Sequence, residues 1–299
     1  KEYLSRHSIV SVCGKMIKRT CIDVDKDYEK FGRISTGEDT LQSIEFFSNA
    51  KTFVYLNHVI YDYRCGSGMT GKFDENYYFT FKKIFEEIIP EISNRDYEGI
   101  LLIVSNPVDI LTYTAIKISG FEENRVIGSG TVLDSARFRY LLGEHLDVDS
   151  RSVQAFIIGE HGDSEIAAWS SVNVSGIPVN DFCEMRGHYD HEEAMKAIAD
   201  NVKESAYKII KRKKATYYGI AMSVKRICEV ILKDEKAILP VSTMMHGAHG
   251  IEDIVLSMPA IVGKNGIETQ VPIELNEEEE RKLKQSARIL KQMIGIKKR

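Results

Sequence analysis

The feature that most constrains this chain is a short apolar run, Ile-Leu-Leu-Ile-Val at residues 100–104, which ends in Ser105-Asn106-Pro107. A continuous apolar run of this length is typical of a strand buried on both faces, and such strands usually belong to parallel sheets covered by helices. Apolar residues at helical spacing precede it at 82–92 and follow it at 108–118. This order predicts βαβ units.

The same patterns continue on both sides of this core. Residues 21–24 and 52–56 read as further strands, and 126–130 as a strand that ends in glycines before a helix from about 131. From 152 onward the pattern is mixed: β-rich stretches at 153–162 and 169–179, helices at 191–215 and 218–232, strands at 238–244, 254–263 and 267–273, and a last helix after Asn276. We therefore predict an α/β fold with a parallel-sheet lobe and a mixed α+β lobe.

Composition narrows the class of protein. Of 299 residues, 40 are basic and 44 acidic, giving a net charge of -4 without a basic stripe, so nucleic acid is not an expected partner. The five cysteines are an odd number without a C-x-x-C pair, which disfavours disulfide and zinc frameworks and favours a reducing cytoplasm. No apolar run approaches the length of a membrane helix, so we expect no membrane contact.

The strongest local candidate for chemistry is His161. It lies in Ile157-Ile158-Gly159-Glu160-His161-Gly162-Asp163-Ser164, where an apolar strand presents a histidine between two glycines. Histidine titrates near neutral pH and so suits proton transfer, and glycines allow a close approach of a ligand or of a second backbone. A histidine satisfied within a turn is the alternative explanation.

A second candidate pair is Asp134 and Arg137, which lie three residues apart at the start of a predicted helix and therefore share a face. In one interpretation they form an ordinary exposed ion pair. In the other, Asp134 orients and charges His161, and Arg137 binds a carboxylate with its two-pronged guanidinium. The spacing is compatible with both.

Taken together, these stretches resemble the NAD-dependent L-lactate dehydrogenases of the lactate/malate dehydrogenase family. The resemblance runs from about residue 99 to the end of the chain. It is carried, in order, by Ser105-Asn106-Pro107-Val108-Asp109, Gly128-Ser129-Gly130-Thr131-Val132-Leu133-Asp134-Ser135-Ala136-Arg137, Gly159-Glu160-His161-Gly162-Asp163-Ser164, Ala215-Thr216-Tyr217-Tyr218-Gly219-Ile220 and Pro259-Ala260-Ile261-Val262-Gly263. It implies a Rossmann-like cofactor domain at 1–129 and a substrate domain at 130–299.

The resemblance also implies roles in substrate chemistry. His161 would exchange a proton with the C2 oxygen of a 2-oxo or 2-hydroxy acid, Asp134 would orient it, and Arg137 would bind the substrate carboxylate. Asn106 would contact the substrate oxygen, and Thr216 would line the substrate pocket. The implied pair is pyruvate and L-lactate, as in fermentation, and no metal is expected.

For the cofactor NAD, the resemblance assigns Val104, Asn106 and Ile220 to the nicotinamide end and Asp23 to the ribose. The first third of the chain departs from the family here, because G-x-G-x-x-G is absent and Gly14 is the only glycine before Asp23. Asp23 lies nine positions after Gly14, which is too short for a phosphate-binding turn, a helix and a second strand. A solvated acid at a strand end is an equally good explanation of Asp23.

A second departure lies where the family has a mobile loop with an arginine that polarises the substrate carbonyl. Alignment on the following helix places Asp74 at that position, and its charge has the wrong sign for a developing alkoxide. Lys72 and Arg64 are nearby cations that could substitute. Loss of one preorganised charge typically costs a factor of about 100 to 1,000, so we expect a slow enzyme.

The resemblance also bears on substrate and assembly. Trp169, after Gly-Asp-Ser, resembles the lactate rather than the malate branch. A homotetramer is implied, and in related bacterial enzymes fructose 1,6-bisphosphate binds between subunits. Arg139 occupies one position of that site, but Gln154 stands where a histidine would supply a charge-assisted bond, so we expect weak or absent activation.

The damaged first third leaves a different class of function open. A pseudoenzyme or scaffold would keep the fold for interactions without turnover. The retained His161, Asp134 and Arg137 favour an active dehydrogenase or recent descent from one.

Overall fold

The computed structural model describes residues 77–94, 97–189, 191–213 and 218–295. The chain divides into two compact units, Lys1–Tyr97 and Glu98–Arg299, which we describe separately. In the first unit the described element is helix α3 (Tyr77–Ser93), which contains the predicted helix at 82–92. The strands predicted at 21–24 and 52–56 lie outside the described residues.

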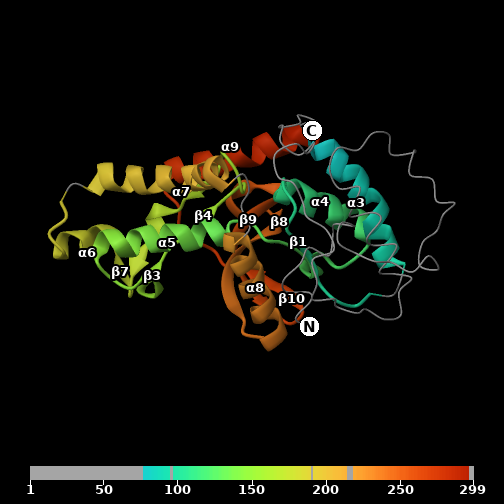
Figure 1. Cartoon of the computed structure of the whole chain (residues 1–299), viewed down its shortest axis with the longest axis horizontal. Helices are drawn as coiled ribbons and strands as arrows, with labels where there is room; N and C mark the ends of the chain where they lie inside the picture. The colour runs from blue at the N-terminus through green and yellow to red at the C-terminus, as the bar shows by residue number, and fades with distance from the viewer. Residues whose placement is uncertain (1–76, 95–96, 190, 214–217, 296–299) are drawn as a thin grey trace. The chain divides into compact units, whose positions relative to one another are not determined.

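The second unit is built on a five-stranded mixed sheet (Figure 1). In spatial order its strands are β1 (Leu101–Ile103), β2 (Val126–Gly128), β8 (Ala237–His246), β9 (Glu252–Gly263) and β10 (Gly266–Gln270). β1 and β2 pair in parallel, which confirms the prediction from the apolar run at 100–104. The last three strands form an antiparallel meander that joins β2 where Gly128 meets Ser242.

Helix α8 (Tyr218–Lys233) covers one face of this sheet. Its Ile227 and Val230 are fully buried in one cluster with Leu239 and Val241 of β8. These β8 residues are two apart, so they project from the same face of the strand. Ser242, the next residue along β8, therefore projects from the opposite face.

Helix α4 (Val108–Ser119) covers that opposite face, at very short range. A Cβ atom added to Gly128 of β2 would lie only 2.5 Å from the hydroxyl of Thr112 on α4 and 2.6 Å from Cβ of Ser242. Glycine is therefore required at this position, because any side chain would push the helix off the strand.

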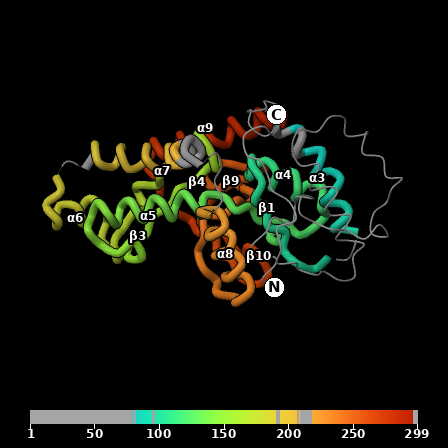
Figure 2. The backbone as a smooth tube through the Cα atoms, in the orientation of Figure 1, coloured from blue at the N-terminus to red at the C-terminus, as the bar shows by residue number. Residues whose placement is uncertain are grey.

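A second hydrophobic core lies beside the sheet and contains helix α5 (Val132–Leu146). Phe138, Leu142 and Leu146 of α5 pack there against helix α7 (His191–Lys213), and α5 and α7 run side by side in Figure 2. Trp169 packs edge-on against Phe138 at 4.8 Å between ring centroids. The other elements of this region are β3 (Val153–Gln154), β4 (Ile157–Ile158), β5 (Ile166–Ala167), β6 (Asn173–Val174), β7 (Ile177–Pro178) and α6 (Val179–Met185).

Two predicted boundaries are corrected by the structure. The stretch predicted as β-rich at 169–179 begins with a 3-10 helix (Trp169–Ser171), and its strands are confined to the short antiparallel pair β6 and β7, of two residues each. The strand predicted at 267–273 ends at Gln270, two residues before Pro272, which has no N–H for a sheet hydrogen bond. Short 3-10 helices also occur at Glu123–Arg125, Ser150–Ser152 and Ala248–Gly250.

The last helix, α9 (Glu277–Met293), begins where the sequence predicted. The side chain of Asn276 accepts a hydrogen bond from the Glu279 amide, and the Glu279 carboxylate accepts one from the Asn276 amide. This reciprocal capping satisfies two N–H groups that the helix itself leaves unpaired.

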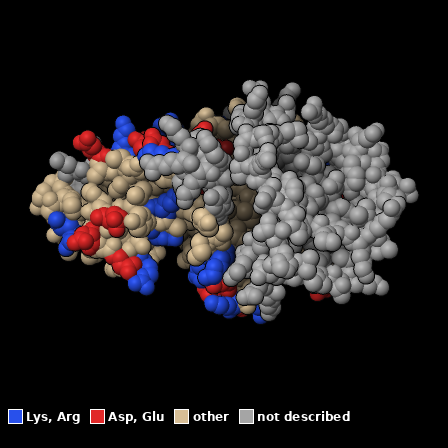
Figure 3. Space-filling view, viewed as in Figure 1, with Lys and Arg blue, Asp and Glu red and all other residues tan. Residues whose placement is uncertain are grey.

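On the described part of the face in Figure 3, acidic and basic side chains are interspersed rather than separated by sign. Within the described ranges, no helix is both long and apolar enough to cross a membrane.

The second core predicts a stability test at α5. Phe138 is fully buried, so Phe138→Ala should destabilise the protein by about 3 to 5 kcal/mol through lost burial and a residual cavity. Tyr140, two residues away and 57 % exposed, is the matched control, and Tyr140→Ala should change stability by less than about 0.5 kcal/mol. Denaturant unfolding measures both, and equal losses would contradict the assigned core.

Candidate active site

The N-terminus of α5 is held in place by hydrogen bonds to β4. The Thr131 hydroxyl donates to the carbonyl of Ile157 at 2.5 Å, and the Ile157 amide donates to the Ser135 hydroxyl at 2.8 Å. All three residues are buried. The start of α5, which carries Asp134, therefore has a defined position relative to the end of β4, which leads to His161.

After β4 the chain turns through Gly159, whose φ of +89° lies in the region that favours glycine. The Gly159 amide and carbonyl both bond to Ser257 of β9, at 2.9 and 2.8 Å. A second backbone thus approaches this glycine closely, one of the two possibilities expected from the sequence. The turn places His161 beside the first turn of α5.

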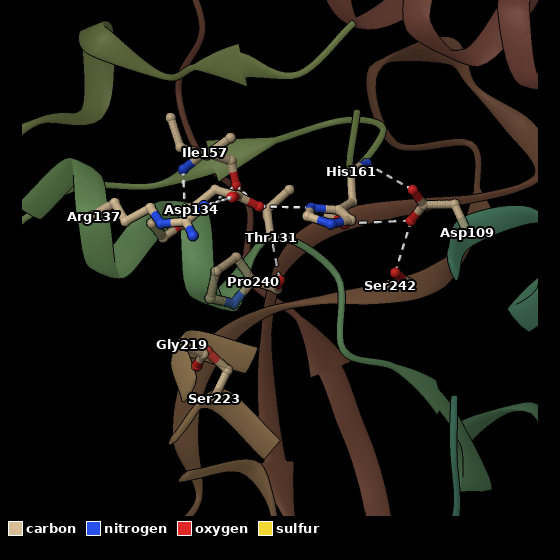
Figure 4. A network of polar contacts seen from close by, with 12 residues as sticks. Asp109, Thr131, Asp134, Arg137, Ile157, His161, Gly219, Ser223, Pro240 and Ser242 are labelled. Carbon is tan, nitrogen blue, oxygen red and sulfur yellow. Dashed lines mark hydrogen bonds and ion pairs between the residues drawn. The ribbon is translucent and has the colours of Figure 1, made fainter. Parts of the chain in front are cut away.

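His161, Asp134 and Arg137 are brought together as predicted (Figure 4). Nδ1 of His161 lies 2.7 Å from Oδ2 of Asp134, and Nη1 of Arg137 donates to Oδ1 of the same carboxylate at 3.3 Å. The Asp134 side chain is only 6 % exposed, while the His161 side chain remains 27 % exposed. Asp134 therefore engages Nδ1 of the imidazole, and Nε2 is the ring nitrogen outside this bond.

These contacts exclude the simpler explanation of each motif that the sequence had left open, while the roles in substrate chemistry stay predictions. Asp134 and Arg137 do form an ion pair, but it is largely buried rather than exposed. The histidine is not satisfied within its own turn, because its ring bonds to a carboxylate 27 residues away.

The local charges favour the imidazolium form of His161. Burial alone would lower the pKa of His161, but the hydrogen bond and charge of Asp134, with the charges of Asp109 and Glu165, raise it to about 9. At neutral pH the ring is then mostly protonated and can donate a proton from Nε2.

Two buried acids near the pair were not predicted as site residues. Asp109 is 2 % exposed and accepts a hydrogen bond from the backbone amide of His161 at 2.7 Å. Glu165 is 7 % exposed, and burial together with the charge of Asp134 raises its pKa. Glu165 directly follows the Gly-Asp-Ser stretch and Asp109 ends Ser-Asn-Pro-Val-Asp, so the sequence contained both positions but no sign of their burial.

The remaining predicted site residues are placed as follows. Val104 and Asn106 directly follow β1, at the carboxyl edge that parallel β1 and β2 share, where open α/β sheets bind ligands. Ile220 is half-buried on α8. Outside the described residues lie Asp23, Arg64, Lys72, Asp74 and Thr216.

Three side chains of this site together form a possible set of metal ligands. Ligand atoms of Asp134, His161 and Glu165 all lie within 4.8 Å of one another. Asp134, however, already accepts hydrogen bonds from His161 and Arg137, which a metal would have to displace.

Comparison with known proteins identifies the family of this chain. Residues 131–298 match the lactate/malate dehydrogenase alpha/beta C-terminal domain, and residues 76–128 match the NAD binding domain of the same family. The chain belongs to the lactate/malate dehydrogenase family. The resemblance seen in the sequence is thereby confirmed, and NAD is the cofactor of the matched first domain.

Individual relatives agree. The chain is 49 % identical to L-lactate dehydrogenase 1 of Clostridium acetobutylicum over 211 residues, which cover 71 % of this chain and 67 % of that protein. It is 50 % identical over 212 residues to the L-lactate dehydrogenase of Acetivibrio thermocellus, with the same coverage of each. The ligand-bound crystal structure of the minor L-lactate dehydrogenase of Enterococcus mundtii aligns with a TM-score of 0.72 at 42 % identity, covering 77 % of this chain and 73 % of that one.

The described residues fit the nicotinamide end of NAD. Asn106 offers an exposed amide at the carboxyl edge of β1, and Ile220 an apolar side chain on α8. These are the residues that would hold the reactive end of the cofactor. The phosphate-binding turn and the ribose acid of the family would fall within residues 1–76, outside the described part.

The geometry of Arg137 predicts that this residue binds the substrate carboxylate. Only Nη1 of Arg137 is engaged by Asp134, which leaves the rest of the fork for a substrate carboxylate. Arg137→Lys should raise the KM for the 2-oxo acid at least tenfold, because a point charge cannot replace bidentate binding. Steady-state kinetics measure this, with NADH affinity as the control; an unchanged KM would contradict the role.

Proposed function

We propose that this protein is an L-lactate dehydrogenase, which reversibly reduces pyruvate to L-lactate with NADH. The observation that carries the proposal is the shared carboxylate of Asp134, which bonds His161 on one side and Arg137 on the other. His161 would supply a proton donor, and Arg137 would bind a carboxylate. A 2-oxo acid, whose carbonyl lies next to its carboxylate, matches this arrangement.

The roles of the residues follow from their chemistry. Arg137 would bind the substrate carboxylate and so orient the neighbouring carbonyl. NADH, when bound, supplies the hydride that reduces the carbonyl carbon. His161 would donate the proton from Nε2 to the carbonyl oxygen, and Asp134 would stabilise the imidazolium before transfer. In lactate oxidation neutral His161 would take the hydroxyl proton instead.

Several finer properties remain proposals. We propose pyruvate over oxaloacetate as substrate, a homotetramer with weak or absent fructose bisphosphate activation, and a cytoplasmic location. Gln154 is exposed on β3, and Arg139 is half-buried on α5. We also keep the division into a cofactor domain at 1–129 and a substrate domain at 130–299.

The direct test is substrate discrimination by the purified protein. NADH oxidation should be faster with pyruvate than with oxaloacetate or 2-oxoisocaproate at equal concentration. A higher kcat/KM for oxaloacetate would refute the lactate assignment. NADH binding without turnover on any of the three would support the scaffold alternative, and NADH fluorescence enhancement detects that binding.

The raised pKa of His161 predicts opposite pH dependences for the two directions. Pyruvate reduction needs the imidazolium, so kcat/KM should be constant below the raised pKa and fall tenfold per pH unit above about 9. Lactate oxidation needs neutral imidazole and should rise over the same range. Rate profiles between pH 6 and 10 test this, and a reduction profile that falls near 6.5 would mean that Asp134 does not act on His161.

A further inference from the structure

The turn that carries His161 is fixed by three consecutive backbone amides, each bonded to a different element. The Gly159 amide donates to the carbonyl of Ser257 on β9, and the Glu160 amide donates to the hydroxyl of Ser286 on α9 at 2.9 Å. The His161 amide donates to Oδ2 of Asp109 on α4 at 2.7 Å. Of these three acceptors, Asp109 is the one that can carry a charge.

Asp109 is itself held firmly. Its other oxygen, Oδ1, accepts from the Ser242 hydroxyl of β8 at 2.7 Å and from the Ser257 hydroxyl of β9 at 3.4 Å. It lies in the first turn of α4, where the helix dipole favours a negative charge. The carboxylate thus joins α4, two strands of the central sheet and the turn that carries His161.

The protonation state of Asp109 is compatible with a charged role. Burial raises its pKa to about 6, although the hydrogen bonds from Ser242 and His161 lower it. Above pH 7 the group is therefore mostly ionised, and its charge favours protonation of His161.

We propose that Asp109 is a positioning residue for the relay histidine, which fixes the backbone of His161 and supplies a second negative charge that keeps the imidazole protonated. This inference rests on the proposed function of His161. It divides the work between two acids: Asp134 bonds the ring, and Asp109 bonds the backbone and acts on the ring through charge.

Other charged groups near His161 determine how far the pKa of its ring should shift when the Asp109 charge is removed. Asp134 from α5 has the largest influence in favour of the imidazolium, followed by Asp109 from α4 and then by Glu165 from the segment before β5. Glu160 precedes His161 in the turn, and Arg137 lies on the far side of Asp134. Removal of the Asp109 charge should therefore shift the pKa of His161 less than removal of the Asp134 charge.

The test is Asp109→Asn, which retains an oxygen acceptor of the same shape and removes the charge. The falling limb of kcat/KM for pyruvate reduction should move down by about one pH unit. The KM for pyruvate at pH 7 should stay within twofold, because Arg137 is untouched. Asp109→Ser removes the charge and leaves a single hydroxyl oxygen one bond closer to the backbone than the carboxylate oxygens, which weakens the bond to the His161 amide. It should show the same shift and a further loss of kcat from the loosened turn.

The matched control is Asp253→Asn. Asp253 also ties α4 to the start of β9, through Lys117 at 2.8 Å, but it is exposed, and its side-chain hydrogen bonds come from Lys117 and Tyr113 of α4. It should leave the pH profile unchanged. If the Asp109 variants and the control have the same profile as the unmodified enzyme, Asp109 has a structural role alone and the proposal is wrong.

A second readout separates this inference from the proposed function. Proton NMR titration of the His161 ring, assigned with a His161→Gln variant, needs neither substrate nor turnover. The pKa of the ring should be lower in Asp109→Asn, and in Asp109→Ser if the first variant does not fold. An unchanged ring pKa in the variants would overturn the inference even if the unmodified protein is an active enzyme. A lowered ring pKa would sustain the inference even if the unmodified protein reduces no 2-oxo acid, a result that would refute the proposed function alone.

Discussion

The 2.7 Å hydrogen bond between His161 and Asp134 is the interaction on which the site depends. A buried carboxylate is costly unless it is paired, and Asp134 is paired twice, with His161 and with Arg137. The same bond selects Nδ1 of the imidazole, so that Nε2 is left for the substrate. Burial, charge and geometry at one side chain thus favour one protonation state and fix the orientation of His161.

The position of that bond is a consequence of packing. Val132, at the start of α5, belongs to the hydrophobic cluster between α8 and the central sheet. Further along α5, Phe138, Leu142 and Leu146 belong to the second core. Asp134 therefore lies on a helix held by both cores, close to where they meet. The histidine is held from the opposite direction, through backbone hydrogen bonds to β9, α9 and α4. Support on both sides fixes the orientation of the imidazole, which proton transfer between its Nε2 and a bound substrate would require.

Much of this arrangement was predictable from local patterns. The apolar run before Ser105-Asn106-Pro107 identified β1, and the acid-rich start after Asn276 identified α9. His161 and Asp134 could be paired only by combining motifs, since each alone has an ordinary explanation. Asp109 was missed because its hydrogen-bond partners Ser242 and Ser257 are 133 and 148 residues away in the sequence. Both serines lie on strands whose register is not specified by any periodicity in the sequence. The predictions for Asp23, Asp74 and Thr216 remain predictions.

The central claim is that His161, oriented by Asp134, donates the proton to the carbonyl oxygen when a 2-oxo acid is reduced. The most direct measurement is single-turnover reduction of pyruvate by NADH already bound to a His161→Asn variant. Asparagine keeps a polar side chain of similar size but cannot supply a proton near neutral pH. The account predicts that NADH affinity is unchanged while the rate falls by at least about 100-fold. A near-normal rate with bound NADH would contradict it.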